Sequence, residues 1–201
     1  MKIIFFGDSI TDSNRNRAEV NDLGDGYVKF AANKIKLLYP EKDLTILNCG
    51  VSGDRTADLL ARVEKDVVSE KPDVVVMLAG INDVWRRFDA GLITTKEEFS
   101  ANYRKLVETI EGGGAKLILI EPFLLNVSAR RPFRPYVSEF AAAVREIAGG
   151  RIPLIPMDEI FKGLSQDIAP AQFAADGIHP THRGSRYIAD QVVKELKKII
   201  R

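Results

Sequence analysis

Short apolar runs alternate with longer amphipathic segments along the whole chain. Five runs are almost continuously apolar and are predicted to be strands: residues 3–6, 44–47, 74–78, 117–120 and 154–155. Such runs are typical of a parallel sheet that is covered on both faces. Five further segments repeat their apolar residues at helical spacing: residues 27–38, 56–68, 96–110, 136–148 and 182–200. The alternation predicts an α/β fold of three layers, with helices on both faces of a doubly wound parallel sheet.

The size and charge of the chain narrow its class further. With 201 residues and no linker, repeat or low-complexity tract, we expect one domain over residues 1–201. Lys and Arg number 29 against 28 Asp and Glu, a balance that argues against a nucleic-acid partner. No apolar run approaches a membrane span, and the N-terminus leaves no room for a signal peptide. If the chain is complete, we expect a cytoplasmic protein, and the sequence leaves open whether it forms a homo-oligomer.

Polar turns directly follow three of the predicted strands. Ser9 lies in the turn after the first strand, Gly53 in the turn after the second, and Asn82 in the turn after the third. In doubly wound folds, ligands bind beyond the carboxyl ends of the strands. We therefore expect these three residues to lie together at one edge of the sheet.

A possible nucleophile, base and acid are present in this chain. Asp176 and His179 are three residues apart in one turn near the C-terminus. A hydroxyl, an imidazole and a carboxylate that orients the imidazole make up an activated oxygen nucleophile. We predict that Ser9 attacks, His179 takes its proton and Asp176 orients His179. The simpler alternatives are that Ser9 is a turn serine that caps a helix and that Asp176 and Gly177 form an ordinary turn. The other histidine, His182, is expected to be solvated or to cap a helix.

Two residues are candidates for stabilising negative charge on a reacting carbonyl oxygen. The backbone N–H of Gly53 and the side chain of Asn82 would form an oxyanion hole with the backbone N–H of Ser9. Alternatively, Gly53 is a turn glycine that leads into a helix, and Asn82 caps the next segment. Four neighbouring aspartates are expected to bond loop amides and shape the turns rather than to react: Asp8, Asp12, Asp54 and Asp83.

These motifs, in this order, resemble those of the SGNH hydrolases, also called the GDSL family of esterases and lipases. The matching segments are residues 7–12, 48–53, 79–83 and 176–180, spread over nearly the whole chain. The resemblance implies a flavodoxin-like five-stranded sheet. It also implies catalysis by Ser9, Asp176 and His179, an oxyanion hole of Ser9, Gly53 and Asn82, and no metal or cofactor.

Within that family, three segments look most like those of acetyl xylan and xylo-oligosaccharide esterases: residues 7–12, 24–28 and the loop after Asn82. The resemblance implies that Tyr27, Trp85 and Arg86 contact the substrate. A Trp ring stacks on a sugar, and an arginine fork binds hydroxyls or a carboxylate. The alternatives are core packing for Trp85 and surface charge for Arg86. The basic loop at residues 130–135 either lines the rim of the site or is simply solvated.

The sequence therefore predicts a serine esterase acting on a small-molecule ester. We expect it to remove short acyl groups, most often acetyl, from carbohydrate such as xylo-oligosaccharides. A broad carboxylesterase, thioesterase or lysophospholipase of the same family is the nearest alternative. A metallophosphoesterase would need several His and Asp ligands, and this chain has 2 histidines. The third alternative is a non-catalytic ligand-binding domain of this fold, and the intact catalytic set speaks against it.

Overall fold

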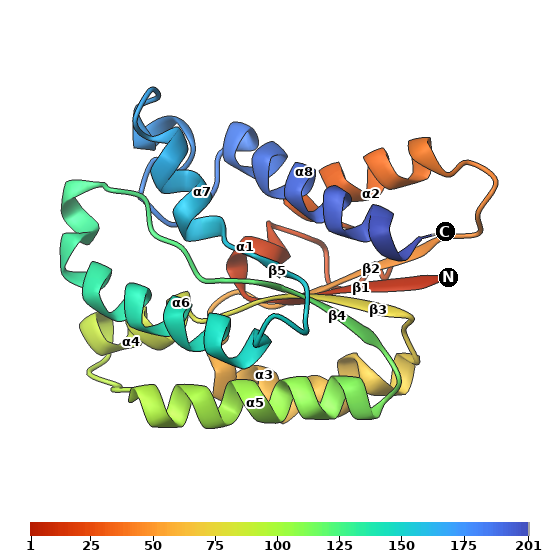
Figure 1. The fold of residues 1–201 in the computed structure, drawn as a ribbon, viewed down its shortest axis with the longest axis horizontal. Helices are drawn as coiled ribbons and strands as arrows, with labels where there is room; N and C mark the ends of the chain where they lie inside the picture. The colour runs from red at the N-terminus through yellow and green to blue at the C-terminus, as the bar shows by residue number, and fades with distance from the viewer. Residues whose placement is uncertain (201) are drawn as a thin grey trace.

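The computed structural model describes residues 1–200 and confirms the three-layer α/β fold (Figure 1). One sheet holds five parallel strands in the order β2-β1-β3-β4-β5, the flavodoxin-like order. The strands are β1 (Lys2–Gly7), β2 (Thr45–Gly50), β3 (Val74–Leu78), β4 (Lys116–Ile120) and β5 (Leu154–Ile155). All five lie where the apolar runs predicted them, with small shifts at their ends.

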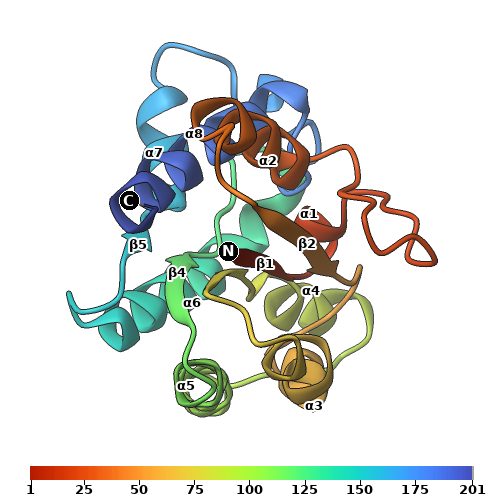
Figure 2. The ribbon, with the colours of Figure 1, turned by 90° about the vertical axis from the view of Figure 1, so that its right-hand side faces the viewer.

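Helices cover both faces of the sheet, as Figures 1 and 2 show. One face carries α2 (Tyr27–Leu38), α7 (Met157–Leu164) and α8 (His182–Ile199), and the other carries α3 (Thr56–Asp66), α5 (Lys96–Gly112) and α6 (Arg134–Ala148). The shorter α1 (Ser9–Asp12) and α4 (Ile81–Asp89) follow β1 and β3. Three 3₁₀ turns complete the secondary structure: η1 (Val68–Glu70), η2 (Ser128–Phe133) and η3 (Pro170–Gln172).

Three helices are absent from the sequence prediction, namely α1, α4 and α7. Helix α1 has 4 residues, too few for an apolar period to be visible. Helix α4 starts almost directly after β3, and its sequence mixes buried polar residues with arginines. Helix α7 has 8 residues and follows a proline, which obscured its short apolar pattern. All three lie beyond the carboxyl ends of strands, where the candidate site lies.

The core consists of the strands and the apolar faces of the long helices. Every side chain of β3 is buried, as expected for a central strand covered on both faces. Between α5 and α6, Phe99 stacks on Phe140 with ring centroids 4.1 Å apart. Among residues 1–200, no helix has the length and apolar character that crossing a membrane requires. The cytoplasmic location stays a prediction.

The strand register brings the ends of three strands side by side. Gly7, the last residue of β1, pairs with Gly50 on β2 and with Leu78 on β3. A Cβ atom on Gly7 would lie 2.3 Å from the carbonyl oxygen of Leu78, so only glycine permits this close approach. Val51 then donates its backbone N–H to the carbonyl of Gly7 at 3.0 Å. The three turns that carry Ser9, Gly53 and Asn82 therefore begin next to one another.

Candidate active site

Ser9, His179 and Asp176 form one continuous chain of hydrogen bonds. Ser9 opens α1, and its Oγ lies 3.0 Å from Nε2 of His179. Nδ1 of the same imidazole lies 2.7 Å from Oδ2 of Asp176. An ionised carboxylate only accepts hydrogen bonds, so Nδ1 carries the proton and Nε2 is left to accept from the serine hydroxyl. The structure thus brings together the nucleophile, base and orienting acid that the sequence predicts.

The turn that holds the base is built around the Asp176 carboxylate. Its Oδ1 accepts the backbone N–H groups of Ile178 and His179 at 2.9 and 2.8 Å. Burial alone would raise the pKa of Asp176, but the hydrogen bonds from His179 and these amides outweigh it and hold the pKa well below its usual range. The hydrogen bond to Asp176 raises the pKa of His179, with burial opposing it. The carboxylate therefore orients the imidazole and favours its protonated form.

Three hydrogen-bond donors in the turns after β1, β2 and β3 are candidates for the oxyanion hole: the backbone N–H groups of Ser9 and Gly53 and the side-chain amide of Asn82. Gly53 has φ +92°, a left-handed conformation that favours glycine. Within residues 1–200, neither Gly53 nor Ser9 donates its backbone N–H to a protein acceptor. Asn82 is 5% exposed and uses its Nδ2 to donate to the carbonyl of Asp54 at 3.0 Å, which leaves its second amide hydrogen to donate elsewhere. Donors of this kind at the strand ends are suited to stabilising an oxyanion.

Asn48 and Arg62 support the turn that carries Ser9. Asn48 begins the matching segment 48–53 but was given no role from the sequence, and Arg62 was not identified at all. The Asn48 amide donates to the carbonyl of Thr11 at 2.7 Å and accepts from the N–H of Gly50 at 2.9 Å. The Arg62 guanidinium donates to the carbonyls of Gly7 and Cys49 at 3.0 and 2.9 Å. An asparagine inside an apolar strand was a signal that could have identified Asn48, whereas Arg62 looks like any charged residue of an amphipathic helix.

Asp8 is a fully buried carboxyl group directly before the nucleophile. Its Oδ1 accepts the backbone N–H of Ile10 at 3.0 Å and so caps α1. Its Oδ2 has no hydrogen-bond partner among the described residues. Burial raises the pKa of Asp8 to about 7, although the Ile10 hydrogen bond and the charge of His179 oppose the shift. The cap confirms the prediction that Asp8 shapes the turn.

Two more of the four aspartates also bond backbone amides. Asp12 accepts the N–H of Ser52 at 3.1 Å, and Asp83 accepts both the N–H and the hydroxyl of Thr56 at 3.0 and 2.7 Å. Asp83 belongs to α4, so these hydrogen bonds attach the first residue of α3 to α4. Asp54 differs from the prediction, because its carboxylate pairs with a guanidinium from α3 at 2.6 Å. The loops of the site are thus braced by carboxylates.

Tyr27 does not face the site, and the prediction that it contacts substrate is wrong. Its side chain is 0% exposed, packs edge-on against Phe5 and shares a 3.0 Å hydrogen bond with the hydroxyl of Thr11. Tyr27 begins α2, and the apolar face of that helix turns toward the sheet. Its hydroxyl helps to hold α1 in place instead.

Trp85 and Arg86 both lie at the site. The Trp85 ring is centred 5.9 Å from the His179 ring, and the Arg130 guanidinium lies over it at 4.2 Å. Arg86 pairs with Asp89 at 2.6 Å. A Cβ atom on Gly53 would lie 3.1 Å from Nη2 of Arg86, so this guanidinium borders the candidate oxyanion hole.

The contact between Arg130 and Trp85 bears on whether Trp85 can bind a sugar and on whether the basic segment lines the site. Because Arg130 covers one face of the Trp85 ring, a stacked sugar would have to use another part of the ring or displace the guanidinium. Arg130 belongs to the basic segment at residues 130–135. The prediction of a loop there is wrong, because the segment forms part of η2 and the start of α6, but at Arg130 it is part of the rim. Contacts of Trp85 and Arg86 with substrate stay predictions.

His182 lies apart from the hydrogen-bonded chain. It is exposed at the first position of α8 and lies edge-on to Phe30 with centroids 5.9 Å apart. The helix cap is Thr181, whose hydroxyl accepts from Gly184 at 3.2 Å. Of the two expectations for His182, solvation is confirmed and capping is wrong. Within residues 1–200, no three His, Cys, Asp or Glu side chains gather to hold a metal ion.

Replacing the buried amide of Asn82 tests the oxyanion hole. We expect Asn82→Ala to lower kcat by roughly 10² to 10³ with little change in KM, because the donor acts mainly on the transition state. Steady-state rates with a small acetate ester measure both constants. A rise in KM alone would instead make Asn82 a binding residue or a brace of the Asp54 loop.

Comparison with known proteins identifies the family. The model of the GDSL-like Lipase/Acylhydrolase family matches residues 5–187. The acetylxylan esterase of Geobacillus stearothermophilus is 33% identical over 97% of this chain and 93% of its own length. The crystal structure of an acetylxylan esterase from that organism superposes with a TM-score of 0.89 at 32% identity, covering 97% of this chain and 93% of that one.

Two further findings come from these relatives. Crystal structures are also known for three catalytic mutants of the Geobacillus esterase, in which a serine, a histidine or an aspartate is changed to alanine. The thioesterase 1/protease 1/lysophospholipase L1 of Escherichia coli K12 is 25% identical over 78% of this chain and 69% of its own length.

Proposed function

The chain belongs to the GDSL-like lipase/acylhydrolase family, and from that premise we propose that it is a serine esterase that removes acetyl groups from carbohydrate such as xylo-oligosaccharides. The observation that supports this most directly is the 3.0 Å and 2.7 Å chain from Ser9 through His179 to Asp176. The similarity of this protein to the Geobacillus acetylxylan esterase over nearly its whole length supports the proposed specificity for acetyl groups on sugars.

Acylation begins with attack of the Ser9 Oγ on the ester carbonyl carbon. His179 Nε2 takes the hydroxyl proton as the new C–O bond forms, and Asp176 stabilises the imidazolium. The carbonyl oxygen becomes an oxyanion and accepts hydrogen bonds from Ser9, Gly53 and Asn82. Collapse of this intermediate breaks the ester bond, and the imidazolium gives its proton to the leaving sugar oxygen.

Deacylation repeats these steps with water as the nucleophile. His179 takes a proton from water, whose oxygen attacks the acyl carbon attached to Ser9. The same donors stabilise the second oxyanion. The proton then returns to the Ser9 oxygen, which leaves free enzyme and acetate.

A broad thioesterase or lysophospholipase activity is the alternative that a specific observation favours. One relative at 25% identity carries both activities in its name. Ser9, Asp176 and His179 do not line the cavity of about 540 Å³ between α6 and α7, so that cavity does not serve as an acyl tunnel at the triad.

A substrate screen tests the proposal against that alternative. Acetylated xylo-oligosaccharides, acetate, butyrate and octanoate esters, and an acyl thioester should be compared by kcat/KM. We expect the acetyl sugars to be best and the alkyl esters to decline gradually, since one methylene changes binding by only about 1–3 kcal/mol. A preference for octanoate over acetate would assign the protein to the lipase and thioesterase branch.

Trp85 provides a test of sugar recognition. We expect Trp85→Ala to lower kcat/KM for acetylated xylo-oligosaccharides by at least about tenfold, because only a sugar gains from contact with the ring. Hydrolysis of ethyl acetate by the same variant, followed in a pH-stat, is the control and should change much less, because its small alcohol group has no ring to stack on Trp85. Equal losses on both substrates would make Trp85 a support for His179 rather than a sugar-binding residue.

A further inference from the structure

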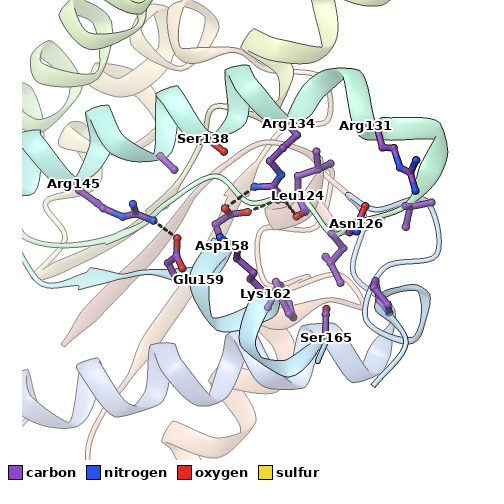
Figure 3. A pocket seen from close by; sticks show the side chains of 15 residues that line it. Leu124, Asn126, Arg131, Arg134, Ser138, Arg145, Asp158, Glu159, Lys162 and Ser165 are labelled. Carbon is purple, nitrogen blue, oxygen red and sulfur yellow. Dashed lines mark hydrogen bonds and ion pairs between the residues drawn. The ribbon is translucent and has the colours of Figure 1, made fainter. Parts of the chain in front are cut away.

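A cavity lies between α6 and α7 (Figure 3). Its volume is about 540 Å³, within the range of small-molecule binding sites. It lies beyond the carboxyl ends of β4 and β5, with the segment 124–127 forming one wall. Ser9, Asp176 and His179 do not line it. The proposed ester hydrolysis therefore leaves this cavity without a role.

The walls of the cavity carry unbalanced positive charge. Four cationic side chains line it, from Arg131, Arg134, Arg145 and Lys162, against two carboxylates. Both carboxylates are already engaged, because Asp158 pairs with Arg134 at 2.7 Å and Glu159 lies 3.5 Å from Arg145. Arg145 also pairs with the buried Glu121 at 2.7 Å.

The other two cations are free to meet a ligand. Within residues 1–200, neither the Arg131 guanidinium nor the Lys162 ammonium has an ion-pair or hydrogen-bond partner on the protein. Arg131 is contributed by η2 and Lys162 by α7, so they approach the cavity from different walls (Figure 3). Two unpaired cations on facing elements favour an anion, and an arginine fork is suited to a carboxylate.

The rest of the lining is mixed: Asn126, Ser138 and Ser165 are polar, and the other residues are apolar. Among the apolar residues, Val127 and Pro170 are partly exposed, whereas Leu124, Leu125, Ala141 and Phe161 are buried. A small inorganic anion would leave the exposed parts of Val127 and Pro170 in contact with water, whereas an apolar body would cover them. We propose that the cavity binds an organic carboxylate with an apolar body, larger than the acetate released at Ser9, at a site separate from the one that hydrolyses esters.

The backbone of the segment 124–127 separates the two sites. Leu125 donates its N–H to the carbonyl of Gly177 at 2.9 Å, and a Cβ atom on Gly177 would lie 3.3 Å from Cβ of Val127. Gly177 lies between Asp176 and His179 in the catalytic turn. A ligand in the cavity therefore contacts one side of the segment while the catalytic turn packs on the other.

Calorimetric titration with 4-phenylbutyrate tests the proposal, with 4-phenylbutyramide as its neutral counterpart. We expect the carboxylate to bind at least about tenfold more tightly than the amide, because hydrogen bonds to a charged group contribute about 1.5–3 kcal/mol. Lys162→Ala and Arg131→Ala should each weaken binding several-fold. Lys105→Ala, which removes an exposed cation from α5 outside the cavity, is the matched control and should leave binding unchanged.

Two further measurements place the ligand. Ser138→Trp fills the cavity mouth from the exposed surface of α6 and should abolish binding while ester hydrolysis continues. Competitive inhibition of 4-nitrophenyl acetate hydrolysis in the same concentration range would place 4-phenylbutyrate at Ser9 and overturn the proposal. Failure to bind, or equal binding of inorganic phosphate, would overturn it as well.

Discussion

Ser9→Ala is expected to remove ester hydrolysis almost completely and to leave the fold intact. The loss in kcat should be on the order of 10³-fold or more, because the hydroxyl is the attacking atom and the rest of the site cannot replace it. The fold should persist for two reasons. The Ser9 hydroxyl bonds only to His179 among the described residues, and the cap of α1 is the carboxylate of Asp8.

Three measurements check this result. Initial rates with 4-nitrophenyl acetate measure the loss in kcat. A thermal melt monitored by circular dichroism shows whether the fold is kept. Mass spectrometry after treatment with a serine-directed phosphonate should find one adduct on wild type and none on Ser9→Ala. Ser52→Ala removes an exposed hydroxyl from the neighbouring loop and should retain both activity and labelling. A folded Ser9→Ala protein with near wild-type turnover would contradict the assignment.

The strands and the edge that carries the site were predictable for one physical reason. Strands that are covered on both faces must be apolar throughout, so the five runs stand out from the chain. Parallel strands share one carboxyl edge, and turns after successive strands must meet there. Ser9, Gly53 and Asn82 could therefore be placed together before any coordinate was known.

The packing around the site could not be predicted in the same way. Ser9 and His179 are separated by 170 positions, and no local pattern gives the distance between them. Tyr27 shows the limit most clearly, because a phenol near a catalytic motif has the same chemistry whether it faces the site or the core. Its burial depends on how α2 is rotated on the sheet. The position of the Arg130 guanidinium over Trp85 likewise depends on how η2 packs on α4, which no local pattern gives.

The two histidines should differ sharply on substitution. His179→Ala should lower kcat by about 10³-fold or more, because it removes the only base that contacts Ser9 among the described residues. His182→Ala should stay within about twofold of wild type, because His182 is exposed and lies outside the hydrogen-bonded chain. Equal damage from both substitutions, or loss of activity on treatment with a chelator, would indicate a metal site in place of this mechanism.

The pH dependence tests the same base without removing it. Only the neutral imidazole accepts a proton from Ser9, so activity should rise as His179 loses its proton. The hydrogen bond to Asp176 raises the pKa of His179, and the acidic limb of kcat/KM should therefore have its midpoint above the ordinary value of about 6.5. Asp176→Asn removes the charge that raises this pKa. In this variant the acidic limb of kcat/KM should move to lower pH. The plateau of kcat/KM above that limb should fall by about 10³- to 10⁴-fold, since the imidazole also loses its orientation. A limb that stays in place in Asp176→Asn would mean that a group other than His179 controls the rate.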